Sequence, residues 1–165
     1  MKKTWTQLLS CLLLSLSISS FSKAESRAVD QDLFKTIQRE AEQSNPHAQY
    51  YLGLLYYWMN YYGKAHEWFE KAAEQGLAQA QFSLGVMYDQ GRGVPQNDVK
   101  AFEWYEKSAQ QGDVDAQLSL GVMYMIGQGT PQNQATAKEL FKQACDNGDK
   151  TGCNNYRLLM SELAE

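Results

Sequence analysis

Residues 80–88 read AQFSLGVMY, and residues 116–124 repeat them 36 positions later as AQLSLGVMY. An earlier copy, AQYYLGLLY, occupies residues 48–56, 32 positions before the middle one. A second block follows each copy, as WFEKAAEQG at 68–76, WYEKSAQQG at 104–112 and LFKQACDNG at 140–148. Self-similarity with a period of about 20–50 residues is the signature of a repeat architecture, so these blocks decide the fold.

The segment between the two blocks has the composition of a loop. Residues 91–95 read GRGVP and residues 127–131 read GQGTP; Gly readily adopts positive φ, and Pro cannot continue a helix. Asn97 and Asn133 follow as predicted N-caps of a second helix. A glycine favours the left-handed conformation that ends many helices, and one closes each second block, at Gly76, Gly112 and Gly148. Each unit is therefore predicted to be helix A, a loop, helix B and a glycine stop.

Apolar residues recur at helical spacing in both helices and predict a shared core. In helix A they are Ala80, Leu84, Met87 and Tyr88, and in helix B they are Ala101, Trp104, Tyr105 and Ala109. A helical Gly costs about 1 kcal/mol relative to Ala, so the recurrence of Gly85 in every copy predicts a close helix approach. One hairpin cannot bury its own apolar face, but stacked neighbours can. We expect an all-α, α/α superhelical solenoid of about three repeats with N- and C-terminal capping helices.

The N-terminus has the layout of a secretory signal peptide. Lys2 and Lys3 precede an apolar stretch over residues 8–21, and small residues at 22 and 24 suit a cleavage site. The stretch is shorter than the roughly 20 residues of a membrane span, so we expect no span in the mature chain. The predicted segments are a signal peptide at 1–24, a linker and cap helix at 25–46, repeats at 47–76, 77–112 and 113–148, and a C-terminal capping helix at 149–165.

Cleavage after residue 24 changes the charge and the cysteine count. All 19 acidic residues but only 12 of the 15 basic ones follow that position, which leaves a net charge of −7. Phosphate neutralisation by basic residues supplies most nucleic-acid affinity, so nucleic acid is not an expected partner. Cys145 and Cys153 remain, and an even pair in a secreted chain indicates a disulfide. We therefore predict a periplasmic or secreted protein of unknown oligomeric state.

Residues 80–112 resemble the Sel-one-like repeat family, which is related to the tetratricopeptide repeats. The pattern is Ala-x-x-x-Leu-Gly-x-x-Tyr, Gly-x-Gly-Val-Pro, Lys-Ala-x-x-Trp-Tyr-x-Lys-x-Ala and a closing Gly. The resemblance covers about residues 40–160 and implies a scaffold or adaptor for other proteins. Cys145 and Cys153, with seven residues between them, are also similar to the cysteine-rich bacterial members, in which such a pair bridges adjacent helices. Those members imply an alternative function in penicillin binding or weak β-lactam hydrolysis.

No catalytic, cofactor or metal site is predicted. The Ser-x-x-Lys pattern of serine β-lactamases occurs at Ser20 and Lys23, inside the signal peptide. His47 and His66 lack metal-ligand spacing to each other or to cysteine, so structural roles are expected for both. The protein is accordingly predicted not to be an enzyme.

Two groups of residues are candidates for binding a protein or peptide. The first repeat holds aromatic residues beyond those of the motif, at Tyr57, Trp58, Tyr61 and Tyr62, and such residues are favoured anchors at interfaces. The alternative is that they pack the inter-helix loop of the first repeat, which is four residues shorter than in the other two repeats, against the N-terminal cap helix. The second group is a ladder at two helix A positions that should line the concave face: Gln49, Gln81 and Gln117 at one, Ser83 and Ser119 at the other. This ladder either hydrogen-bonds an extended peptide or is solvated polar surface.

Overall fold

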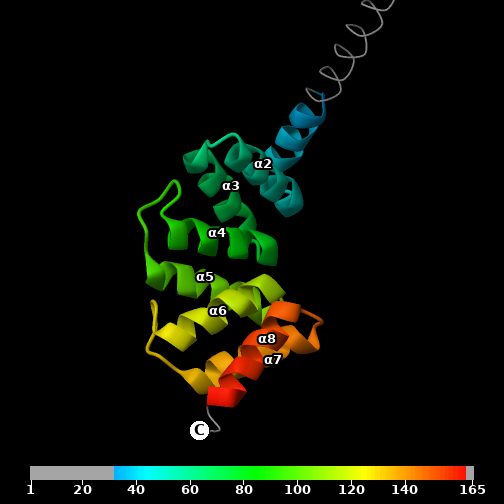
Figure 1. Cartoon of the computed structure of the whole chain (residues 1–165). Helices are drawn as coiled ribbons and strands as arrows, with labels where there is room; N and C mark the ends of the chain where they lie inside the picture. The colour runs from blue at the N-terminus through cyan, green and yellow to red at the C-terminus, as the bar shows by residue number, and fades with distance from the viewer. Residues whose placement is uncertain (1–31, 163–165) are drawn as a thin grey trace, which may run out of the picture.

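The computed structural model describes residues 32–162, and within that range all regular structure is helical. A first helix covers residues 32–42. Seven helices of equal length follow in chain order: α2 (Pro46–Trp58), α3 (Tyr62–Glu74), α4 (Ala78–Gln90), α5 (Asp98–Gln110), α6 (Val114–Ile126), α7 (Gln134–Asp146) and α8 (Lys150–Glu162). The predicted all-α solenoid is confirmed, with α2, α4 and α6 as helix A and α3, α5 and α7 as helix B (Figure 1).

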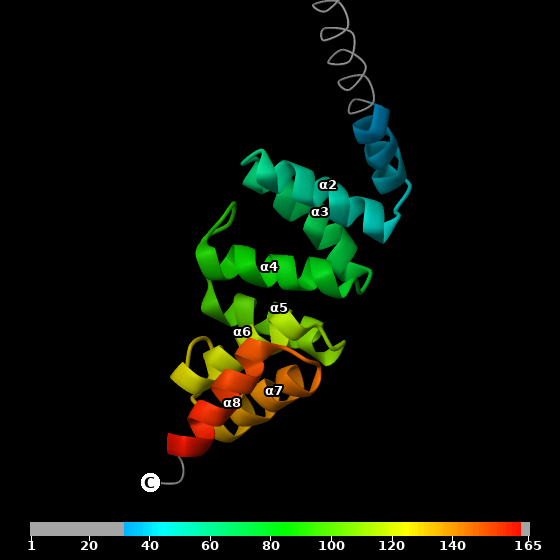
Figure 2. The ribbon, with the colours of Figure 1, turned by 45° about the vertical axis from the view of Figure 1, so that its right-hand side comes forward.

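Each helix packs mainly on the next one in the chain, so the molecule is a stack with two ends. The pairs α2–α3, α4–α5 and α6–α7 form hairpins, and α3–α4 and α5–α6 contacts join one hairpin to the next. The N-terminal helix lies at one end of the stack and α8 at the other (Figure 2). The buried core follows this order as a chain of small clusters along the stack, as expected when each repeat contacts only its neighbours.

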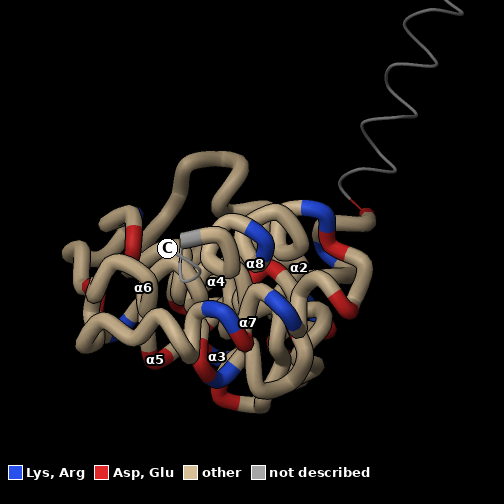
Figure 3. Tube along the Cα trace, turned by 60° about the horizontal axis from the view of Figure 1, so that its bottom comes forward, with Lys and Arg blue, Asp and Glu red and all other residues tan. Residues whose placement is uncertain are grey.

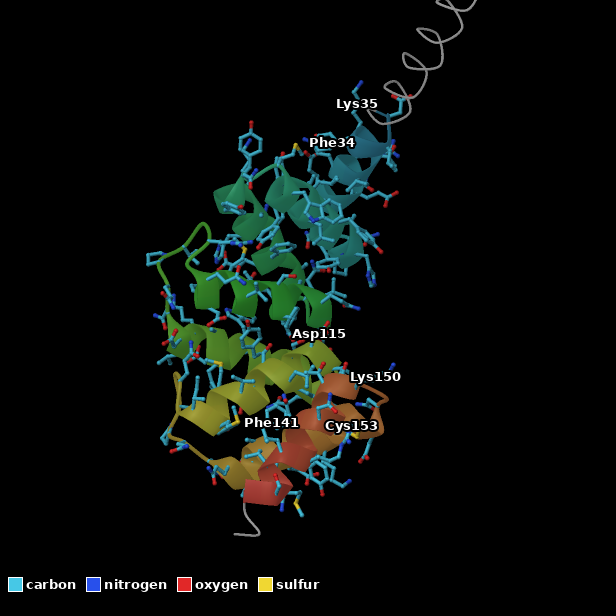
Figure 4. The ribbon with its side chains drawn as sticks, viewed as in Figure 1. Phe34, Lys35, Asp115, Phe141, Lys150 and Cys153 are labelled. Carbon is cyan, nitrogen blue, oxygen red and sulfur yellow. A yellow bond between two sulfur atoms is a disulfide. The ribbon has the colours of Figure 1, made fainter. Side chains whose placement is uncertain are left out.

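The glycine of each helix A lies directly on an aromatic ring of its helix B. A methyl group on Gly85 would lie 2.5 Å from the Tyr105 ring, and one on Gly53 would lie 2.6 Å from the ring of Phe69. Gly121 has the same relation to Phe141 in the third repeat, and Figure 4 labels the Phe141 side chain. The predicted close approach is therefore confirmed, and only a residue without a side chain allows it.

The predicted helix ends are also confirmed. Asn97 and Asn133 cap α5 and α7, and their Oδ1 atoms accept hydrogen bonds from the amides of Lys100 (3.0 Å) and Thr136 (3.1 Å). Gly76 follows α3 with φ of 88°, and Gly112 and Gly148 repeat this conformation. Of the predicted helix B stripe, Trp104 is only half-buried, and the Lys107 ammonium lies over its ring, 4.0 Å from the centroid.

The loop of each longer repeat lies on the repeat before it. Gly93 packs against the backbone of Tyr62, where a methyl group would lie 2.7 Å from the Tyr62 carbonyl. The neighbouring Arg92 donates a hydrogen bond to the Tyr57 hydroxyl. In the next loop Gln128 takes the place of Arg92 and donates to the carboxylates of Asp89 (3.1 Å) and Asp98 (3.2 Å). The loops therefore join consecutive hairpins on the side opposite to the glycine stops.

A disulfide joins Cys145 near the end of α7 to Cys153 in α8 (Figure 4). The Cα atoms of the pair are 4.4 Å apart, and Gly152 lets α8 approach Ala144. The predicted pairing is confirmed. The link closes a small loop, for which chain entropy gives a stabilisation of about 2–3 kcal/mol, and it holds the last helix on the stack.

The signal peptide predicted at residues 1–24 lies outside the described residues. Within residues 32–162, none of the helices combines the length and the apolar character that crossing a bilayer requires.

The glycine contact can be tested by adding a single methyl group. We expect Gly85→Ala to lower the free energy of unfolding by about 1–2 kcal/mol, because the overpacking against Tyr105 outweighs the better helix propensity of Ala. The matched control is Gly63→Ala in α3, where a methyl group meets no atom within 4 Å. That change should raise the stability by up to about 1 kcal/mol. Urea unfolding followed by circular dichroism measures both, and a Gly85→Ala protein as stable as the wild type would contradict the proposed contact.

Candidate functional site

A groove of about 320 Å³ lies on the helix A side of the first two repeats. α2 contributes Tyr50, Leu54 and Tyr57 to its wall, and α4 contributes Phe82, Ser83 and Val86. Phe69 of α3 also lines it. The six wall residues from α2 and α4 are half-buried, so the stack covers them only in part. The groove is mostly apolar, lies at the small end of the range of about 300–1,000 Å³ for ligand sites, and has room for a few side chains.

Helix A carries almost no charge, which is why the wall of the groove is apolar. α2 has no charged residue, α4 has only Asp89 and α6 has only Asp115. The helices α3, α5 and α7 carry nearly all the other charges of the three repeats, with acidic and basic positions interspersed (Figure 3). The two sides of each hairpin therefore differ in chemistry: helix B is a solvated charged surface, and helix A carries one charged residue at most.

Two carboxylates stand where the groove meets α6. Asp113 is the N-cap of that helix, and its Oδ1 accepts a hydrogen bond from the Ala116 amide at 2.9 Å. Burial raises the pKa of Asp113, although the bond from Ala116 opposes the shift. Asp115 follows in the first turn with an exposed side chain, at the start of α6 (Figure 4).

The phenol of Tyr50 lies at the same end of the groove. Burial is the main cause of a raised pKa for Tyr50, and the nearby charge of Asp113 adds to it, while the Ser83 hydroxyl lowers it. The Tyr50 side chain is half-buried and lines the groove. This end of the groove thus offers a neutral phenol, a hydroxyl and two carboxylates.

The four aromatic candidates of the first repeat divide into two pairs. Tyr57 and Tyr62 are half-buried with ring centroids 5.2 Å apart, and the Arg92 guanidinium lies over both rings. They therefore seal against the loop of the next repeat, not against the cap helix as the structural alternative supposed. Trp58 and Tyr61 point to solvent, with 71% and 59% of their surface exposed. Of the four, only Tyr57 lines the groove.

The glutamine ladder lies in the interior, which contradicts the expectation of an accessible polar row. Gln81 is 6% exposed; its Nε2 donates to the Ala73 carbonyl at 3.2 Å, and its Oε1 accepts from Gln111 at 2.7 Å. Gln49 and Gln117 are also buried, and each accepts a bond from the end of its own helix B. A polar side chain suits this buried position because it forms hydrogen bonds with groups that stacking removes from water.

The two serines lie beside the glutamines but differ in accessibility. The hydroxyls of Ser83 and Ser119 donate to carbonyl oxygens one turn earlier in their own helices, at 2.8 and 2.9 Å. Ser83 is part of the groove, whereas Ser119 is outside its lining. The structure therefore brings Ser83 and Tyr57 together from the two candidate groups. The sequence interpretation missed Phe82, Val86, Asp113 and Asp115, although the lack of charge in helix A was visible in the sequence.

The two histidines lie apart from the groove. The His66 Nε2 atom is 3.2 Å from the Tyr88 hydroxyl, and His47 is exposed at the start of α2. Among residues 32–162 no group of three or more metal-ligating side chains is present.

Comparison with known proteins gives a family match over most of the described residues. The model of the Sel1 repeat matches residues 46–77, 78–113 and 114–149. Each match ends one residue later than the corresponding repeat predicted from the sequence. A comparison with the curated proteins gives no match.

Several solved structures are similar to this chain. A protective antigen of uropathogenic Escherichia coli strains, which displays an SLR fold, is 34% identical with a TM-score of 0.74 over 78% of this chain. A Sel1 repeat protein from Oxalobacter formigenes is 33% identical, with a TM-score of 0.69 over 77% of this chain and 98% of its own. Cysteine rich protein B of Helicobacter pylori is 30% identical, with a TM-score of 0.53 over 55% of this chain and 68% of its own. This chain spans only 28% of the E. coli antigen.

The buried role of the glutamines gives a prediction about stability. We expect Gln81→Ala to lower the free energy of unfolding by about 1–3 kcal/mol, because the buried Ala73 carbonyl loses its side-chain donor. Gln90→Ala, at an exposed position of the same helix, should change stability by less than about 0.5 kcal/mol. Thermal unfolding of both variants measures the difference. Equal stability would mean that Gln81 is dispensable for stacking.

The raised pKa of Asp113 gives a prediction about pH. Because the folded protein holds this proton more tightly than the unfolded chain, Asp113 weakens the fold as pH rises from 3.8 through its raised pKa. Asn is as good an N-cap as Asp, so Asp113→Asn should remove this dependence. We expect the stability of the variant relative to the wild type to rise with pH across that window and then to stay level. Unfolding curves from pH 3 to 8 measure the difference, and a flat difference would contradict the assignment.

Proposed function

Because the chain belongs to the Sel1 repeat family, we propose that it is a secreted interaction module that binds a polypeptide segment in the groove between α2 and α4. Members of this family are generally non-enzymatic repeat scaffolds that serve protein–protein interaction. The observation that carries the proposal is the groove itself: aromatic and aliphatic side chains from two repeats meet there, and the stack leaves them partly open.

A polypeptide segment fits this surface better than a globular face does. The groove is lined by side chains of two successive repeats, so one segment lying across α2 and α4 contacts both. Half-buried aromatic residues are effective anchors, since they offer a large apolar area and lose little side-chain freedom on binding. The volume suits a few side chains of an extended chain.

The outer aromatic pair extends the same proposal. Trp58 and Tyr61 are exposed next to Tyr57, which lines the groove. A segment that leaves the groove past Tyr57 reaches these two residues. They serve as a secondary contact in the proposal and not as its main site.

Location outside the cytoplasm is part of the proposal. The disulfide and the bacterial neighbours fit an extracytoplasmic protein. The predicted signal peptide adds to this support. Nothing in the described residues favours the β-lactam alternative over binding, so that alternative stays a prediction from resemblance.

The groove can be tested with a charge placed at its wall. A phage-displayed library of random 12-residue peptides, selected on the oxidised protein, should yield peptides that bind the wild type. Val86→Arg should weaken their binding by tenfold or more, because the long cation fills the groove and removes apolar surface. Val99→Arg is the matched control, since Val99 lies exposed on α5 and outside the groove.

Fluorescence anisotropy of the selected peptides measures both variants. Peptides that bind Val86→Arg as well as the wild type would place the binding surface elsewhere. Loss of binding only in the Trp58→Ala/Tyr61→Ala protein would assign it to the outer aromatic pair. A parallel incubation with fluorescent penicillin tests the β-lactam alternative, and stoichiometric labelling would support that alternative.

A further inference from the structure

We propose that the groove selects a segment in which a Lys or Arg side chain lies next to a bulky apolar residue, with the cation held by Asp113 and Asp115. This inference rests on the proposed function and names the chemistry of the partner. It is carried by the position of the two carboxylates in the groove and by the lack of an ion-pair partner for either of them within residues 32–162.

Within residues 32–162 the two carboxylates have no cationic partner. Among the described residues that line the groove, Asp113 and Asp115 are the only charged ones, and neither forms an ion pair within residues 32–162. The Asp113 carboxylate is half-buried beside apolar residues. A guanidinium or ammonium group from a partner would supply the missing positive charge, and hydrogen bonds that involve an ion are stronger than neutral ones.

The charge of the groove is asymmetric, which assigns the cation to one end. Tyr50 lies in the first turns of α2, close enough to Asp113 for that charge to raise its pKa. Tyr57 lies seven residues later, about 10 Å along the helix, and its hydroxyl accepts a hydrogen bond from the Arg92 guanidinium. A basic side chain is therefore repelled from the Tyr57 end and attracted to the α6 end.

The apolar neighbour follows from the rest of the lining. Between the two ends the wall is formed by side chains such as Leu54, Phe82 and Val86, which carry no charge and no hydrogen-bonding group. A basic side chain alone would leave this apolar wall exposed to water. A Leu, Phe or Trp beside it in the sequence would cover the wall and also exclude water from the ion pair, which strengthens that pair.

Asp113 and Asp115 can be neutralised with little effect on the fold. Asp113→Asn keeps the N-cap of α6, because Asn is as good a cap as Asp, and Asp115→Asn changes an exposed side chain. The matched control is Glu67→Gln/Glu103→Gln, which removes two negative charges from exposed positions of α3 and α5, outside the groove. Both double variants have the same net charge, so any difference between them is local.

The experiment uses the peptides selected on the wild-type protein in the library screen. We expect them to be enriched in Lys or Arg adjacent to a bulky apolar residue. Replacing that Arg by citrulline, or that Lys by norleucine, should raise Kd about tenfold or more on the wild type, as expected for a hydrogen bond to a charged group. On Asp113→Asn/Asp115→Asn the same replacement should change Kd less than threefold, and on the glutamate control it should again cost about tenfold.

The outcomes separate this inference from the proposed function. Peptides that are lost with Val86→Arg but show no basic preference, or that tolerate citrulline, would leave the groove as a binding site and overturn the cation inference. Peptides that bind regardless of Val86→Arg would overturn both. A citrulline effect of equal size on wild type and on Asp113→Asn/Asp115→Asn would place the cation at other carboxylates and also overturn the inference.

Discussion

The stack depends on the contact between one helix A glycine and one helix B aromatic ring in each repeat. Gly85 and Tyr105 lie so close that a methyl group on the glycine would be 2.5 Å from the ring. Because the hairpin closes at this point, the alanines around it, such as Ala80 and Ala101, are completely buried. Interiors are packed as densely as organic crystals, so a close contact repeated at the same position in every hairpin sets a common geometry for all of them.

Hydrogen bonds made by buried glutamine side chains join one hairpin to the next. Bringing the hairpins together removes backbone carbonyl groups such as that of Ala73 from water, and Gln81 supplies the donor that this group then requires. The same glutamine accepts a bond from Gln111 at the far end of its own repeat. A repeat thus carries its own means of joining to its neighbour, and the first repeat uses Gln49 in the same way against the N-terminal helix.

The two helices of each repeat present different surfaces to water. Helix B meets water with interspersed charges, and lysines lie over Trp68 and Trp104 at 4.0 Å to shield the rings. Helix A carries few charges of its own, and its aromatic and aliphatic residues in the first two repeats form a groove. The first repeat differs most from the motif here: Tyr50 and Tyr57 are tyrosines where the third repeat has Leu118 and Met125.

The amino-acid sequence alone determined the repeat, the hairpins, the helix ends, the glycine contact and the disulfide. These follow from local chemistry, since propensity, capping and spacing act within one unit and each unit is present three times. The tertiary structure alone decided which polar and aromatic residues are accessible. Gln81 and Ser83 are both polar and two positions apart, yet one is buried in the stack and the other opens into the groove. Asp113 and Tyr50 are more than 60 residues apart in the sequence and meet only because successive repeats stack. Both residues line one groove because of the way successive hairpins are placed in the stack, and the sequence of a single repeat does not specify that placement.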